Sequence, residues 1–183
     1  INLPQKKEEE FLKIDFTSLF DFDFKEHKTL DFALDLESIK DDEVYDSKLF
    51  SIANSFDNSK RVLTISEDLE KPLIIVNKLK NSETLYTNNL LINVKEGVKA
   101  SVIEVFTSSL NNSTNLSNRT IEVEKNGSLA YVKIQDISIA NSLIFSCKAK
   151  QDDKSNLEIS NFEFGDGFCV NSFEKKIDSL EGN

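Results

Sequence analysis

The chain has 183 residues, enough for one domain of ordinary size and a small appendage. Hydrophobic residues make up 39% of it, and because Met and Trp are absent the core must consist mainly of Ile, Leu, Val and Phe. The formal net charge of −10 disfavours nucleic acids and anionic membranes, since both bind basic surfaces. No apolar run is long enough to cross a bilayer, so no membrane partner is expected.

Residues 1–57 are predicted to form a small helical or mixed region. Pro4 and the acids after it are typical of a helix start. Alternating Asp and Phe over 21–24 favour an extended segment, and residues 30–36 have the alternation of a half-buried strand. From Val44 to Phe56 the apolar residues recur with gaps of three and four, which predicts the clearest helix of the chain.

Residues 58–183 have a β pattern throughout. A polar stretch from Thr107 to Ser117 interrupts it and is predicted to be an exposed loop. The predicted strands are Arg61–Ser66, Pro72–Lys78, Leu85–Val94, Lys99–Thr107, Ser117–Glu124, Leu129–Gln135, Ser142–Lys150, Asn156–Phe164 and Phe168–Ile177.

Two segments within this β region repeat one short pattern. The glycines, alanines and final valines are each displaced by 30 residues, so Ala100 and Ala130 are expected to meet in neighbouring coils. Such a repeat favours a parallel β-helix, whose coils stack and hydrogen-bond to one another. A β-sandwich of hairpins remains the alternative from the pattern alone. The paired residues are Ile92, Val94, Gly97, Ala100 and Val102 with Ile121, Val123, Gly127, Ala130 and Val132.

The sequence offers little for catalysis. His27 is the only histidine, so no Ser-His-Asp set can be assembled from an obvious motif, and no phosphate-binding glycine loop occurs. Arg61 and Arg119 are the only arginines, and no acid cluster converges on either in the pattern. We therefore expect no catalytic, cofactor-binding or metal-binding residue in this chain, and a protein that is not an enzyme.

Cys147 and Cys169 lie 22 residues apart, about one coil of a β-helix, so they are expected in adjacent coils. Buried thiols that behave as small hydrophobic groups are the first interpretation. A disulfide would need an oxidising compartment, for which the sequence carries no export signal. A metal or cluster site would need more soft ligands than two thiols. A part in iron or cluster handling stays open for both.

Four stretches together resemble the SufD proteins of iron–sulfur cluster assembly. The opening Leu3–Phe16 is similar to the start of that family, and Leu49–Phe56 resembles one of its helices. Val62–Leu73 resembles the strand and Pro-containing segment that begin its β-helix. The coil from Asn118 to Gln135, with Gly127 between strands, is similar to a SufD coil.

The resemblance implies a right-handed parallel β-helix preceded by a small helical region. It also implies a non-catalytic scaffold in a SufBCD-type complex, with SufB-like and SufC-like (ATPase) subunits as partners and a cytoplasmic location. No resident cofactor is implied for this chain. An iron–sulfur cluster would form transiently at the SufB–SufD interface.

Some family features have no counterpart here. Val170 stands where the family usually has Arg before Asn. The family's interface histidine belongs to later coils and has no counterpart here, and His27 matches no family motif. The chain ends at Asn183, before the coils and helices that dock SufC, which suggests a fragment or a short divergent member. An open last coil predicts concentration-dependent association near Phe168–Ile177, that is, a homodimer through the β-helix. A β-helix carbohydrate-active or carbohydrate-binding protein is the alternative function.

Overall fold

The computed structural model describes residues 23–24, 37–40, 59–79, 84–108 and 112–177. These residues contain eleven strands and no helix. The predicted helix at Val44–Phe56 and the predicted strand at residues 30–36 lie outside the described residues. The strands are β1 (Asp23–Phe24), β2 (Glu37–Lys40), β3 (Ser59–Ile65), β4 (Leu73–Leu79), β5 (Thr84–Val94), β6 (Lys99–Ser108), β7 (Thr114–Val123), β8 (Ser128–Ile137), β9 (Ser142–Gln151), β10 (Asn156–Phe164) and β11 (Phe168–Ile177).

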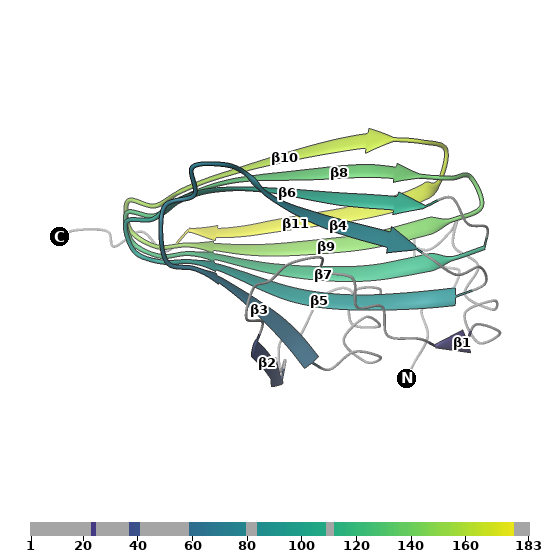
Figure 1. Ribbon diagram of the computed structural model, residues 1–183, viewed down its shortest axis with the longest axis horizontal. Helices are drawn as coiled ribbons and strands as arrows, with labels where there is room; N and C mark the ends of the chain where they lie inside the picture. The colour runs from purple at the N-terminus through teal and green to yellow at the C-terminus, as the bar shows by residue number, and fades with distance from the viewer. Residues whose placement is uncertain (1–22, 25–36, 41–58, 80–83, 109–111, 178–183) are drawn as a thin grey trace.

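The strands form two facing parallel sheets (Figure 1). The first sheet has the order β11-β9-β7-β5-β3-β2, with β1 also paired to β5, and the second has the order β10-β8-β6-β4. Successive strands alternate between the sheets, so each coil adds one strand to each, from the β3–β4 coil to the β9–β10 coil. Among the described strands, only β2 runs antiparallel to its neighbour, β3. The parallel β-helix is confirmed, and the sandwich of hairpins is excluded.

In the two coils that carry the repeat, residues that lie opposite each other are 29 positions apart in the sequence, not 30. Ile92 lies opposite Ile121, as the pattern predicts. The alanines do not meet, because Ala100 lies opposite Leu129 and Ala130 lies opposite Ser101. The prediction that the two alanines stack was therefore wrong. The one-residue error arises at the corner between the two strands of a coil.

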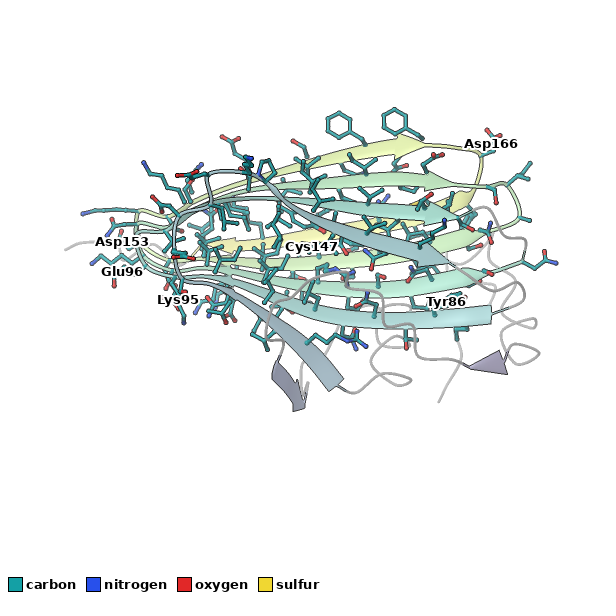
Figure 2. All side chains as sticks on the ribbon, in the orientation of Figure 1. Tyr86, Lys95, Glu96, Cys147, Asp153 and Asp166 are labelled. Carbon is teal, nitrogen blue, oxygen red and sulfur yellow. The ribbon has the colours of Figure 1, made fainter. Side chains whose placement is uncertain are left out.

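The corners between β5 and β6, between β7 and β8 and between β9 and β10 each place one residue in the left-handed region. Gly97 has φ of 74°, Asn126 has 58° and Lys154 has 56°. In each case the next residue donates its backbone N–H three residues back, as Val98 does to Lys95 O at 3.1 Å. Because Asn tolerates this conformation, the second coil uses Asn126 where the first uses glycine, and Gly127 lies one position later. Figure 2 shows the corner residues Lys95, Glu96 and Asp153 together at one end of the molecule, opposite Asp166.

The core lies between the two sheets and consists of ladders of branched and aromatic side chains. Ile92, Val94, Ile121 and Val123 are at most 1% exposed. Phe106 of β6 contacts Phe145 of β9 edge to face, with ring centroids 5.6 Å apart, and so ties one sheet to the other. Burial of each such side chain contributes roughly 1.5–3 kcal/mol. Among the described residues no helix is long and apolar enough to span a membrane.

The predicted loop at 107–117 is wrong over its second half. Strand β7 begins at Thr114, and Asn115, Leu116 and Ser117 are buried. The polar side chains are accommodated because they bond to each other, since Ser117 Oγ donates to Asn115 Oδ1 at 2.7 Å. A buried polar group costs little once it has a hydrogen-bond partner, so a run of Asn and Ser forms an interior strand here.

Candidate functional site: a charged cluster inside the β-helix

A buried ion pair joins the two sheets. Glu104 on β6 and Arg119 on β7 are both 0% exposed. Arg119 Nε donates to both carboxylate oxygens, at 3.0 and 2.9 Å, and its Nη2 donates to Glu104 Oε1 at 2.5 Å. Arg119 Nη1 also donates to the carbonyls of Asn88 and Asn118, at 3.0 and 2.7 Å. The guanidinium is thus shared between a carboxylate and the backbone.

Further side chains donate hydrogen bonds to the Glu104 carboxylate. The Tyr131 hydroxyl donates to Glu104 Oε2 at 2.5 Å, and Asn77 Nδ2 donates to Oε1 at 2.7 Å. The hydrogen-bond network extends beyond Asn77. Asn88 Nδ2 donates to Asn77 Oδ1 at 2.9 Å, and Arg61 Nη1 donates to Asn88 Oδ1 at 3.2 Å. Both oxygens of Glu104 therefore accept several hydrogen bonds in a site closed to solvent.

The pair is ionised. Burial alone would raise the pKa of Glu104, but the Arg119 charge and the hydrogen bonds from Arg119, Tyr131 and Asn77 hold it below its usual value. Burial would lower the pKa of Arg119, and the Glu104 carboxylate raises it above its usual value. Burial, and next the Glu104 charge, raise the pKa of Tyr131 well above its usual value. Tyr131 is thus a fixed hydrogen-bond donor at neutral pH.

Lys133 of β8 places a further cation in the interior. Its Nζ lies 5.0 Å from the Phe145 ring centroid and 5.9 Å from that of Phe106, and it donates to Asn161 Oδ1 at 3.1 Å. Burial lowers the pKa of Lys133, and the nearby Cys169, Glu163 and Glu104 oppose that shift. The aromatic faces supply part of the stabilisation that water would otherwise give.

The two cysteines lie on adjacent strands, as predicted, but not side by side. Cys147 on β9 is opposite Phe173, and Cys169 on β11 is opposite Leu143. Four positions along a strand separate them by roughly 13 Å, too far for the Cα separation of a disulfide, and both are free thiols. Cys147 lies between the two sheets (Figure 2), in register with Arg119. The interpretation of Cys147 as a buried thiol agrees with its 1% exposure.

A comparison with protein families decides what kind of β-helix this is. The family model described as "SUF system FeS cluster assembly, SufBD core domain" matches residues 76–181, which is more than half of the chain. The chain belongs to the SufBD core family. The match begins in β4 and extends through the last described strand, so it covers the sheets that hold the charged cluster. No curated protein and no solved structure matches the chain significantly.

Sequence reasoning did not predict the buried charge cluster of this SufBD core domain. The sequence pattern showed no acid cluster near Arg119, and the single acid that pairs with it, Glu104, comes from a strand 15 residues earlier and on the other sheet. A signal was present: Glu104 falls at an inward position of β6, in phase with Val102 and Phe106. Lys133 likewise falls in phase with Tyr131 on β8. A charge at an inward position of a strand predicts a buried partner.

No metal centre emerges from the described part of the SufBD core domain, where no three His, Cys, Asp or Glu side chains gather as ligands. His27 lies outside the described residues. The Glu104 carboxylate is already occupied by Arg119, Tyr131 and Asn77, so it has no position to offer a metal ion. The site is best described as a structural charge cluster that fixes the register of the two sheets.

Cys147 and Cys169 lie in different environments and are expected to differ in reactivity toward iodoacetamide. Burial raises the pKa of Cys147 to about 12, with Arg119 lowering it in part. We expect iodoacetamide at pH 8 to leave Cys147 unmodified in the folded protein, because the thiolate is the nucleophile and the side chain is inaccessible. Cys169 is half-buried and is expected to react first, although burial raises its pKa too. Mass spectrometry of labelled peptides checks this, with a urea-unfolded control in which both react. Equal labelling of both thiols in the folded protein contradicts the assignment.

Proposed function

We propose that this chain is a non-catalytic scaffold subunit of a SufBCD-type iron–sulfur cluster assembly complex, of the SufD kind and cytoplasmic. Its partners are a SufB-like subunit and a SufC-like ATPase. The observation that carries the proposal is the SufBD core match over the stacked coils. The resemblance of the coil around Gly127 to SufD coils supports the choice of subunit. The nascent cluster is cargo at a subunit interface, and this chain keeps no cofactor of its own.

The chemistry of the interior supports a scaffold. Catalytic carboxylates need an open position and access to substrate, whereas Glu104 is 0% exposed and bonded on both oxygens. The same burial argues against the carbohydrate-active alternative. A polysaccharide lyase of this fold needs a basic residue in a groove, and neither arginine can serve, since Arg119 is 0% and Arg61 is 9% exposed.

In the part of the chain that the structure describes, the last coil ends in two strands that have no further coil beside them. Within the described residues, β11 pairs only with β9 and β10 pairs only with β8, so both strands have an outer edge. Phe173 and Ile177 on β11 are 41% and 63% exposed, although their register places them on the side that faces the core. A strand from a partner can extend such an edge and cover these side chains.

Co-purification tests the proposal. The tagged chain, co-expressed with the SufB-like and SufC-like subunits of its source organism, is expected to retain both. Ile177→Lys should abolish that retention, because it places a charge on the covered edge. The matched control Ile139→Lys, at a corner residue that is 78% exposed, should not. A folded chain that retains neither subunit, or that cleaves polysaccharide alone, refutes the proposal.

A further inference from the structure

The corner between β7 and β8 contains the dipeptide Asn126–Gly127, the only Asn–Gly pair in the sequence. In such a pair the backbone nitrogen of glycine can attack the side-chain amide carbon of asparagine, because glycine has no side chain to hinder the approach. The new C–N bond closes a succinimide ring, and the side-chain nitrogen leaves as ammonia with the proton of the attacking nitrogen. Water then opens the ring at one of its two carbonyls and gives aspartate or isoaspartate.

The structure leaves the reacting side chain open to water. Asn126 is exposed, and its φ of 58° places it in the left-handed region, which few residues other than glycine and asparagine occupy. Its backbone N donates to Asp153 O at 3.2 Å, so Asn126 lies at the end of the molecule where Asp153 is labelled in Figure 2. Water can therefore reach the amide that would be lost and the ring that would form.

The attacking nitrogen, in contrast, is held in place. Gly127 N donates to Glu124 O at 2.9 Å, and Gly127 O accepts from Asn156 N at 2.8 Å. Gly127 is buried, and a Cβ atom there would lie 2.9 Å from Glu124 O and 3.2 Å from Lys95 O. The nitrogen must lose its proton and turn toward the Asn126 side chain before the ring can close. Both steps require the corner hydrogen bonds to break first.

We propose that Asn126 is a covalent modification site that the fold keeps closed, and that it converts to aspartate or isoaspartate only when the β7–β8 corner opens. The rate in the folded protein is then the rate in the unfolded chain multiplied by the fraction of time that the corner is open. The modification therefore marks chains that have opened at this end. The reaction needs only water, and the proposal does not rest on the proposed function, because no partner subunit takes part.

Two other corner residues show why Asn126 is singled out. Asn112, between β6 and β7, has the same φ of 58° and is also exposed. It is followed by Ser113, whose Cβ hinders the ring closure that glycine permits, and whose backbone N donates to Asn141 Oδ1 at 3.0 Å. Asp166 also precedes a glycine, but a carboxylate is a poorer target for a nucleophile than an amide. Asn112 is therefore the matched comparison within the chain.

The two products fit the corner differently. Isoaspartate continues the chain through its side-chain carboxyl, so it adds one backbone atom between β7 and β8. Ser128 N, two residues after Asn126, donates to Val98 O of the preceding coil at 2.8 Å, and the added atom shifts this bond and the tightly packed Gly127. Aspartate keeps the chain length, and its charge lies one coil from Lys154, which holds the same left-handed position. Only isoaspartate is expected to destabilise the fold.

Ageing of the full chain, folded in buffer and unfolded in urea, tests the proposal. Mass spectrometry follows the peptides, and a protein isoaspartyl methyltransferase serves as the probe for isoaspartate. In urea, Asn126 should convert before Asn112, and in the folded protein its conversion should be at least about tenfold slower. Alkaline pH should accelerate both reactions, because the attacking nitrogen must lose its proton. The control Asn126→Gly, which copies Gly97 of the preceding coil, should fold and form no isoaspartate at this corner.

Refolding of the aged chain separates the two products. Isoaspartate should be enriched in the fraction that fails to refold from urea, whereas Asn126→Asp, which has the normal linkage, should unfold at the same urea concentration as the original chain. Equal rates in folded and unfolded protein would overturn the gating by the corner. Conversion of Asn112 as fast as Asn126, or no conversion even in urea, would overturn the assignment of the site. Equal isoaspartate in the refolded and unrefolded fractions would overturn the effect on the fold.

Discussion

Replacement of Glu104 by Gln is expected to lower the free energy of unfolding by about 3–5 kcal/mol, because it leaves the Arg119 charge buried without a carboxylate. Gln keeps the size of the side chain, so the change isolates the charge. A domain of this size has a total stability of roughly 5–15 kcal/mol, so the variant loses at least about a fifth of it. Urea unfolding followed by circular dichroism measures the loss.

A surface pair in the same fold supplies the control. Lys95 Nζ and Glu124 Oε1 are 2.7 Å apart, almost as close as the buried pair, but the two side chains are 43% and 34% exposed. Glu124→Gln is expected to cost no more than about 1 kcal/mol, since water solvates the remaining lysine. Equal losses for Glu104→Gln and Glu124→Gln would show that burial does not matter, which contradicts the account of the cluster.

The effect of Glu104→Gln also depends on pH in a defined direction. The folded-state pKa of Glu104 lies below the usual value of 4.5, so its charge stabilises the fold fully above pH 4.5. That contribution is lost as the pH falls through the lowered pKa, because a protonated Glu104 resembles Gln. The difference in stability between the original chain and the variant should therefore be constant near neutral pH and shrink in acid.

The stacked-coil architecture was predictable because its signal is local and repeated. Alternation of period two marks each strand, and the spacing from Ile92 to Ile121 gives the coil length directly. The position of the corner was not predictable to one residue. Gly97 and Asn126 occupy the same left-handed position of their coils. Because the two residue types differ, a comparison of residue identities does not align them, although both can adopt this backbone conformation.

The charge cluster was harder to predict because its members come from strands far apart in sequence. Asn77, Glu104 and Tyr131 lie on consecutive strands of one sheet, while Arg119 comes from the other. In a sequence with 32 acidic residues, a single Glu carries no mark of burial. Only the phase of Glu104 within its strand distinguishes it, and phase becomes informative once the strand boundaries and the inward face are known.

Replacement of Gly165 by Ala is expected to disrupt the last coil. Gly165 forms the corner between β10 and β11 with φ of 80°. A Cβ atom there would lie 2.5 Å from Ile137 O and 3.0 Å from Ile137 N, both backbone atoms of the preceding coil. The same carbonyl accepts a hydrogen bond from Gly167 N at 3.0 Å. Backbone atoms cannot move aside alone, so the corner and its hydrogen bond must shift together.

Gly97 provides the matched control for this corner. It has a similar φ of 74°, but a Cβ there would meet nothing within 4 Å. Gly97→Ala therefore measures the left-handed backbone penalty alone, about 1–2 kcal/mol, whereas Gly165→Ala adds the clash with Ile137 and should lose clearly more. Hydrogen exchange is expected to show the extra loss as faster exchange of the β11 amides, since β11 pairs only with β9 in the described structure. Equal losses for the two alanine variants would mean that the last coil relaxes freely, and would remove the reason to regard its edge as an ordered docking surface.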